Sequence, residues 1–130
     1  MHKSYNFPEP EDFLRLRKIT GISPRSTEAA RKGLPNSLFA ITLYDKSKLI
    51  GMGRVVGDGG CNFEVVDLAV DPVYQGLGCG KQIMEEIMNY LDAEAPPGSF
   101  ISLIADASGL YEKFGFQKIT SASQAMYIKK

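Results

Sequence analysis

The residues best suited to chemistry form a glycine-rich loop between an apolar stretch and an amphipathic one: Gln75-Gly76-Leu77-Gly78-Cys79-Gly80-Lys81. Because glycine lacks a side chain, the backbone N–H groups of such a loop can approach a ligand closely. A helix that begins near Gly78 adds N–H groups without intrahelical acceptors and the positive end of its dipole. The pattern therefore predicts a site for a phosphate or pyrophosphate group.

Two common phosphate-binding motifs do not fit this loop. A P-loop has the form Gly-x-x-x-x-Gly-Lys-Ser/Thr, but Gln75 stands at its first glycine position and Gln82 at its hydroxyl position. A Rossmann fingerprint counted from Gly76 and Gly78 would need its third glycine at Lys81. The loop therefore belongs to a different class of phosphate site.

Two motifs carry a family resemblance. Residues 75–80 follow Leu68-Ala69-Val70-Asp71-Pro72 and resemble the Gln/Arg-x-x-Gly-x-Gly/Ala motif that binds acetyl-CoA in the Gcn5-related N-acetyltransferase (GNAT) family. Downstream, residues 109–116 resemble the family's Tyr-x-Lys-x-Gly-Phe signature. In order and spacing, the resemblance covers residues 38–118. It implies an acyl-CoA-dependent N-acyltransferase with acetyl-CoA as its co-substrate.

The resemblance implies that main-chain groups hold the co-substrate. The loop Gln75–Lys81 would bind the pyrophosphate. In the family, the preceding strand separates from its parallel neighbour and binds the pantetheine arm and the thioester carbonyl. Here the main chain of Leu68, Ala69 and Val70 would take this role, and backbone donors there would stabilise a developing oxyanion. Cys79 is expected to be a small buried residue rather than a nucleophile.

Two side chains are candidates for catalysis. Glu64 is the predicted general base, which takes a proton from the acceptor ammonium; a solvent-facing strand residue is the alternative. Asp67 would point to the opposite face in a regular strand but not in a bulged one, so either carboxylate, or water, remains a candidate. Tyr111 is the predicted general acid, whose phenol would protonate the leaving thiolate; a core aromatic is the alternative.

Three other residues bear on the substrate side. Ile104 replaces the asparagine that many family members use to bind the pantetheine arm, and only Asp106 and Ser108 are polar nearby. Asp58 could bind a cationic substrate, but its Gly-Asp-Gly-Gly context favours a turn. Arg54 is expected to form a surface ion pair rather than to border the substrate.

Length and composition limit the possible functions. The 130 residues predict one domain, 1–130, with a substantial core. Fifteen basic residues balance fifteen acidic ones, which predicts no affinity for nucleic acid or membranes. No apolar run reaches the ~20 residues of a membrane span, and no signal region begins the chain, so a cytoplasmic location is expected. A homodimer is left open.

Cysteine and histidine usage narrows the chemistry further. Cys61 and Cys79 lie outside any Cys-x-x-Cys pattern and are expected to be free thiols. The only histidine is His2, in a terminus expected to be mobile. Its position argues against a Ser-His-Asp or Cys-His site and against a histidine-rich zinc site, so no metal is expected.

The periodicity of apolar residues predicts an α/β (α+β) fold. Its elements are a helix from Pro8 to Gly21, a helix over 26–33, strands over 38–44, 49–56, 62–70 and 100–105, a helix over 78–91, a short helix over 108–114 and further strand towards Lys130. Short connections make the first three strands antiparallel, and a helical crossover makes 62–70 and 100–105 parallel. The result is a GNAT-type mixed, mostly antiparallel, twisted sheet flanked by helices on both faces.

The leading hypothesis is therefore an N-acetyltransferase that transfers the acetyl group of acetyl-CoA to a primary amine of a small molecule. The amine would attack directly, in a sequential mechanism. The alternatives are a non-catalytic CoA-binding sensor or interaction domain, and a protein or peptide N-acetyltransferase.

Overall fold

The computed structural model describes residues 1–105, 109–119 and 122–130. Within these residues, five strands form a sheet in the order β1-β2-β3-β4-β5, in which only β4 and β5 are parallel. The strands are β1 (His2–Ser4), β2 (Phe39–Asp45), β3 (Lys48–Gly57), β4 (Asn62–Val70) and β5 (Phe100–Leu103). The helices are α1 (Pro10–Thr20), α2 (Thr27–Gly33) and α3 (Cys79–Glu94), with short 3-10 turns η1 (Leu34–Asn36), η2 (Pro72–Tyr74) and η3 (Tyr111–Phe114).

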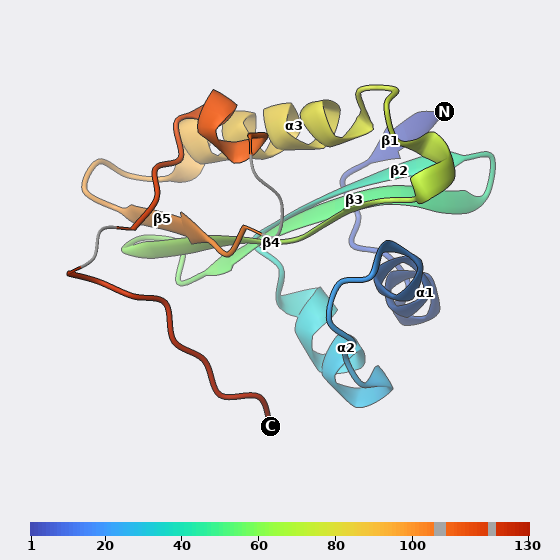
Figure 1. Cartoon of the computed structure of the whole chain (residues 1–130), viewed down its shortest axis with the longest axis horizontal. Coiled ribbons are helices and arrows are strands. Elements are labelled where there is room, and N and C mark those ends of the chain that lie inside the picture. The colour runs from blue at the N-terminus through green and yellow to red at the C-terminus, as the bar shows by residue number, and fades with distance from the viewer. Residues whose placement is uncertain (106–108, 120–121) are drawn as a thin grey trace.

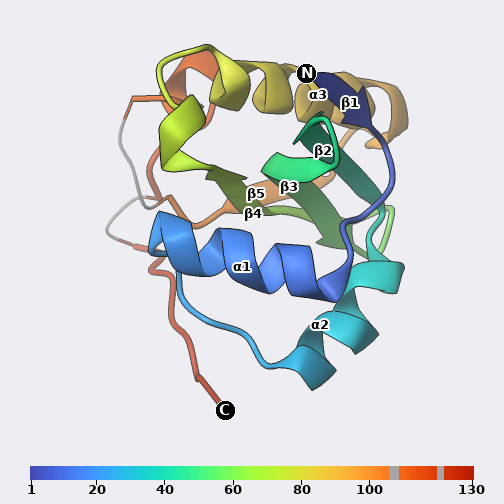
Figure 2. The same ribbon diagram turned by 90° about the vertical axis from the view of Figure 1, so that its right-hand side faces the viewer.

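The sheet is covered on both faces, as the sequence predicts (Figures 1 and 2). Helix α3 lies on one face, where its apolar side packs against Ile41, Val55 and Phe63. Helices α1 and α2 cover the other face over a second core that includes Phe13, Leu16 and Met52. The predicted class, a mixed and mostly antiparallel sheet between helices, is confirmed.

Local signals explain where the first helices begin and end. Helix α1 has Pro10 at its start and acidic residues in its first turn, and it ends at Gly21 with a left-handed φ of 78°. The Ser26 side chain caps α2 by accepting a hydrogen bond of 3.0 Å from the N–H of Ala29. Both helices are thus placed by residues that the sequence alone identifies.

Three expectations differ from the structure. Strand β5 ends at Leu103 rather than at 105. The described part of 116–130 contains no strand, because this tail has no neighbouring strand to pair with. His2 does not lie in a loose terminus: it pairs with Tyr44 across β1 and β2, and the two rings stack with centroids 5.4 Å apart. Residues 106–108, where Asp106, Ser108 and the start of the last expected helix fall, lie outside the described residues.

Within the described residues, no helix combines the length and apolarity needed to cross a membrane.

Candidate active site

The glycine-rich loop connects η2 to α3 and has the geometry of an anion cradle. Gly76 and Gly78 adopt left-handed φ values of 81° and 83°, which disfavour other residues. A Cβ at either position would meet no atom within 4 Å, so the space in front of the loop is open. Gly78 caps α3 without a side-chain hydrogen bond, and the first helical turn contains no acidic residue. The leading N–H groups of α3 are therefore available to a pyrophosphate.

The side chains of the loop leave this cradle clear. Cys79 is buried, as expected of a packing residue rather than a nucleophile. Lys81 lies 3.8 Å from Glu85, one turn further along α3. The Gln75 amide nitrogen donates a hydrogen bond of 3.1 Å to the Val70 carbonyl, which ties the loop to the end of β4. The loop thus fits the co-substrate role that the resemblance implies.

Strand β4 extends beyond the end of its parallel neighbour, β5. The pairing of β4 with β5 ends at Val65 and Leu103, whereas β4 continues to Val70. The main chain of Leu68–Val70 therefore lies beyond the paired part of β5, where the resemblance expects the pantetheine arm. One of its acceptors, the Val70 carbonyl, is already bound by Gln75.

A β-bulge places Asp67 in a buried ion cluster. The β3–β4 register shifts between Met52 and Arg54, and Asp67 adopts a φ of 62°. One carboxylate oxygen of Asp67 accepts a hydrogen bond from Arg17 Nη1, and the other accepts one of 2.6 Å from Arg54 Nε. Because both oxygens are held by guanidinium groups, Asp67 has a structural role and is a poor candidate for the base.

The two arginines extend this cluster across the fold. Arg17 Nε donates to the Ser23 carbonyl at 2.8 Å, and Arg54 Nη1 donates to Ser37 Oγ at 2.8 Å. Burial lowers the pKa of the Arg17 guanidinium, while Asp67 raises it and Arg25 lowers it further. The expectation of a surface pair for Arg54 is wrong, because the side chain is only 11% exposed.

A cleft of about 530 Å³ opens between the α1–α2 connection and the ends of β4 and β5. It is lined by Arg17, Thr20, Gly21, Ile22, Ser23, Arg25, Glu64, Val65, Val66, Asp67, Leu68, Leu103, Ile104 and Tyr111. The structure thus brings the predicted Glu64, Leu68 and Tyr111 to one hollow, whereas Ala69, Val70 and the loop 75–81 do not line it. Within the described residues, no hydrogen bond or ion pair engages the Glu64 carboxylate.

Of the remaining substrate-side candidates, Ile104 lines the cleft and Asp58 does not. Ile104 is two-thirds exposed. Asp58 stabilises the turn in which it lies, because one carboxylate oxygen accepts hydrogen bonds of 2.9–3.0 Å from the N–H groups of Gly60, Cys61 and Asn62. These bonds lower the pKa of Asp58. Because its carboxylate is engaged and lies outside the cleft lining, Asp58 is not a substrate ligand there.

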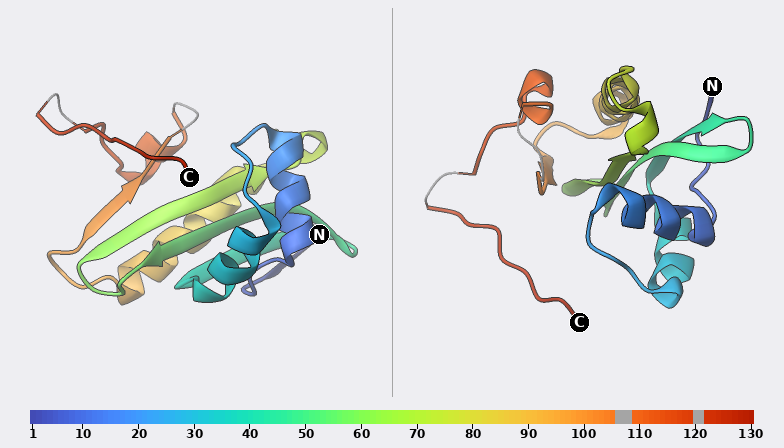
Figure 3. Two further views of the ribbon diagram at one scale, coloured as in Figure 1. Left: turned by 90° about the horizontal axis from the view of Figure 1, so that it is seen from below. Right: turned by 45° about the vertical axis from the view of Figure 1, so that its right-hand side comes forward.

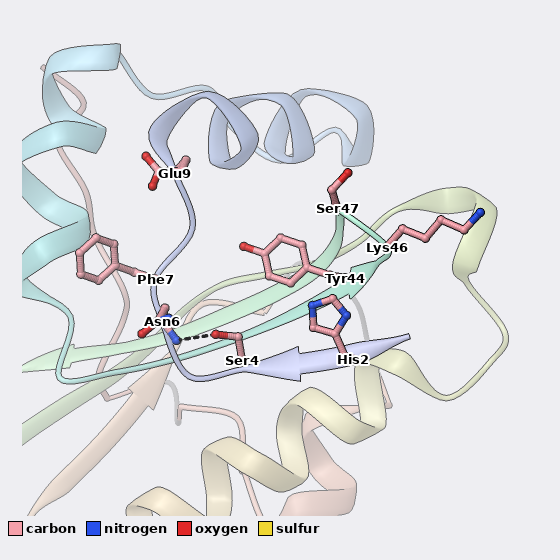
Figure 4. A pocket seen from close by; sticks show the side chains of 8 residues that line it. All are labelled: His2, Ser4, Asn6, Phe7, Glu9, Tyr44, Lys46 and Ser47. Carbon is pink, nitrogen blue, oxygen red and sulfur yellow. Dashed lines mark hydrogen bonds between the residues drawn. The ribbon is translucent and has the colours of Figure 1, made fainter.

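A second hollow, of about 390 Å³, lies by the N-terminus (Figure 4). It is lined by His2, Ser4, Asn6, Phe7, Glu9, Tyr44, Lys46 and Ser47. The Ser4 hydroxyl accepts a hydrogen bond of 3.2 Å from the N–H of Asn6 there. None of the predicted site residues lies in this hollow, so the cleft by β4 is the candidate active site.

Comparison with known proteins settles the family. The model of the acetyltransferase (GNAT) domain matches residues 35–118, more than half of the chain. The chain belongs to the GNAT family. It is therefore an acyltransferase of a family that uses acetyl-CoA, and the geometry of its glycine loop fits that co-substrate.

Several known proteins are similar to this GNAT chain. An uncharacterised N-acetyltransferase from Pyropia yezoensis is 32% identical over 97% of the chain and 73% of its own length. The crystal structure of a probable acetyltransferase from methicillin-resistant Staphylococcus aureus is 51% identical and covers 99% of this chain and 98% of its own, with a TM-score of 0.95. A predicted acetyltransferase from Clostridium acetobutylicum, solved with acetyl-CoA, is 18% identical with a TM-score of 0.69 over 97% of this chain and 96% of its own, and so shares the fold.

Sequence reasoning missed Arg17, the residue that anchors the cleft of this GNAT domain. A usable signal was present: Phe13, Leu16, Arg17 and Thr20 follow helical spacing, which places a cation on the core-facing side of α1. A charge at such a position requires a buried partner. The identity of that partner, Asp67, depends on a bulge that the spacing does not reveal.

Proposed function

We propose that this GNAT domain transfers the acetyl group of acetyl-CoA to a primary amine of a small molecule by direct attack. The observation that carries the proposal is the cleft, which has Glu64 and Tyr111 in its walls and begins where β4 leaves its pairing with β5. An ammonium that enters there finds a carboxylate able to take its proton, and a phenol able to return one to the leaving group. A hollow of this size suits a small acceptor.

Different residues of the chain bind the co-substrate, orient it and transfer protons. The N–H groups of the loop 75–81 bind the pyrophosphate, and the main chain of Leu68 and Ala69 orients the reacting arm. When bound, acetyl-CoA supplies the activated acetyl thioester. Glu64 holds the proton taken from the amine at a carboxylate oxygen, and the Tyr111 hydroxyl donates one. The burial of Cys79 supports direct transfer over a route through an enzyme thiol.

The charges around the cleft favour an acceptor that carries an acidic group besides its amine. Arg17 and Arg54 share Asp67, whereas Arg25 forms no ion pair with any described residue. Arg25 is oriented by Ser23, whose hydroxyl accepts a hydrogen bond of 2.7 Å from Arg25 Nη1. A guanidinium that lines the same cleft as the Glu64 carboxylate suits a zwitterion such as an amino acid or a phosphorylated amino sugar.

The test is thiol release from acetyl-CoA with amino acids, phosphorylated amino sugars, polyamines, arylalkylamines and short peptides as acceptors. The proposal expects turnover with a small amine and intersecting lines in initial-velocity plots. Turnover with peptides alone would identify a protein acetyltransferase instead. Tight CoA binding without turnover of any amine would identify a sensor, and parallel lines would exclude direct transfer.

A further inference from the structure

The glycine-rich loop has few contacts along its own length. Residues 75–78 are all exposed, and among the described residues Gly76 and Leu77 form no hydrogen bond. Glycines leave such a segment many backbone conformations. A ligand that must first order a loop binds less tightly than one that meets the loop already ordered. The elements on either side of the loop therefore bear on how tightly it binds a pyrophosphate.

Each end of the loop is attached to the fold by a side chain. At its C-terminal end, Cys79 is 3% exposed and packs in the core beneath α3. At its N-terminal end, the Tyr74 hydroxyl donates a hydrogen bond of 2.5 Å to Asp45 Oδ2, at the end of β2 and 29 residues away along the chain. This bond raises the pKa of the Tyr74 phenol above its ordinary 10.0, so the phenol remains a donor at neutral and mildly alkaline pH.

A second carboxylate attaches the start of η2 to the same β2–β3 hairpin. The Asp71 side chain is 4% exposed, and its Oδ2 lies 3.5 Å from Nζ of Lys48, the first residue of β3. Its Oδ1 accepts a hydrogen bond of 3.0 Å from the N–H of Val73, and its own N–H donates one of 2.8 Å to the Ile50 carbonyl. Figure 1 and the right view of Figure 3 show η2 at the same end of the sheet as the turn between β2 and β3. Both ends of η2 are thus attached to one hairpin.

We propose that the β2–β3 hairpin positions the pyrophosphate loop, with Asp45 and Tyr74 as the positioning residues. The hairpin does not need the Asp45 side chain for its own closure, because the backbones of Asp45 and Lys48 pair across the turn. The carboxylate is therefore left to hold Tyr74, the residue directly before the loop. A hydrogen bond to a charged acceptor is stronger than one between neutral groups, which suits it to this task. The role rests on the part of the proposed function that places CoA at the loop, and not on the acceptor.

Calorimetry of the full chain with CoA tests the proposal, and it requires no knowledge of the acceptor. Tyr74→Phe removes the hydroxyl and leaves the ring in its packing. We expect the dissociation constant for CoA to rise about three- to tenfold, the equivalent of one net hydrogen bond. Urea unfolding of each variant checks that the affinity is measured on folded protein.

Tyr5→Phe is the matched control. The Tyr5 hydroxyl also donates to a carboxylate, at 2.7 Å from Glu86 Oε2, but this bond links β1 to α3. A comparable loss of stability is expected from it, without a loss of CoA affinity. If Tyr74→Phe binds CoA as tightly as Tyr5→Phe does, the hydrogen bond only stabilises the fold and the proposal is overturned.

A double-mutant cycle on CoA affinity tests whether Asp45 acts through Tyr74. Asp45→Ala and Tyr74→Phe should weaken binding by similar factors, and the double variant should bind no more weakly than either, because the bond is already lost. Asp45→Asn should recover part of the affinity lost in Asp45→Ala, since its amide oxygen can still accept the phenol proton. Losses that simply multiply in the double variant would show that the two residues act separately, which contradicts the proposal.

Gly78→Val distinguishes a failure of this proposal from a failure of the co-substrate assignment. Weaker CoA binding by Gly78→Val beside unchanged binding by Tyr74→Phe would show that the loop binds CoA without help from the hairpin. That result overturns the positioning role alone. Unchanged binding by both variants would show that CoA is not held by the loop, and would overturn both proposals.

Discussion

The co-substrate loop and the acceptor cleft are built in opposite ways. The loop is one continuous segment whose proposed ligand groups are main-chain N–H groups, next to glycines with φ values near 80°. The cleft is assembled from side chains of α1, β4, β5 and η3 and from the α1–α2 connection, held around Asp67 by Arg17 and Arg54. A site made of backbone tolerates changes of side chain outside its glycines, whereas a site made of buried charges depends on each of them.

The largest effect is expected from Asp67→Asn, which tests how far the cleft depends on its central charge. It leaves two guanidinium groups without their shared carboxylate, and Arg17 is 4% exposed. Removal of one partner from a buried ion cluster costs about 3–5 kcal/mol, so urea unfolding should show a loss of that size. The folded variant should still bind CoA through the loop 75–81, because in the described structure no hydrogen bond or ion pair joins that loop to the cluster.

Asp92→Asn is the control for that experiment, since Asp92 is an exposed carboxylate of α3 with no ion pair in the described structure. A loss below ~1 kcal/mol for Asp67→Asn, the range of exposed pairs, would show that the cluster is not what holds the cleft together. Weakened CoA binding by the folded variant would show that the two regions are coupled.

Glu64→Gln should impair catalysis in the cleft without affecting CoA binding at the loop. With the carboxylate gone, turnover should fall about 10²–10⁴-fold, the usual contribution of a positioned base, while CoA affinity stays the same. Part of the rate should return at high pH, where the acceptor amine loses its proton to solvent. Calorimetry with CoA and thiol release across pH measure both effects.

The control here is Glu28→Gln, because Glu28 is exposed on α2 and, within the described chain, forms an ion pair with Lys32 alone. A Glu64→Gln variant that loses turnover without any recovery at high pH would exclude the role of base. Equal losses of CoA affinity and turnover would place Glu64 in the co-substrate site instead.

Gly78→Val tests the backbone site. A β-branched residue at a φ of 83° is strained by about 1–2 kcal/mol, and its side chain would enter the open space in front of the loop. CoA affinity should therefore fall about tenfold, the equivalent of 1.4 kcal/mol. Gly98→Val is the matched control: Gly98 has a φ of 88° and open space around it, but it lies in the turn before β5. Equal CoA affinities of the two variants would contradict the cradle.

The same contrast explains what could be predicted from sequence. The loop could be predicted because Gly76 and Gly78 allow its left-handed backbone conformation. The ends of α1 and α2 could be predicted from their capping residues. The role of Asp67 could not, because it depends on a bulge and on Arg17, fifty residues away along the chain. Strand propensity near Lys130 was a poor guide to the tail, because a strand forms only where an edge pairs with it.

The smallest effect concerns a charge pair closer to the surface, in which the Lys3 side chain is 47% exposed and the Glu86 side chain 14%. It completes the contrast with the buried cluster. The Lys3 ammonium lies 2.9 Å from the Glu86 carboxylate, and the Tyr5 hydroxyl donates to the same oxygen at 2.7 Å. These contacts link β1 to α3. They lower the pKa of Glu86 below its ordinary 4.5, chiefly through Lys3, and raise the pKa of Lys3 above 10.5, chiefly through Glu86.

Glu86→Gln should therefore destabilise the fold only within a defined range of pH. The lowered pKa of Glu86 means that its contribution is full above pH 4.5 and is lost as the pH falls through the folded value. The raised pKa of Lys3 means that its contribution is full below pH 10.5 and is lost as the pH rises through the folded value. Thermal unfolding of the two proteins should differ slightly at neutral pH and coincide in strong acid. A difference that persists in strong acid would show that the effect does not come from the Glu86 charge. A difference at neutral pH that approaches the Asp67→Asn effect would show that this pair contributes as much as the buried cluster.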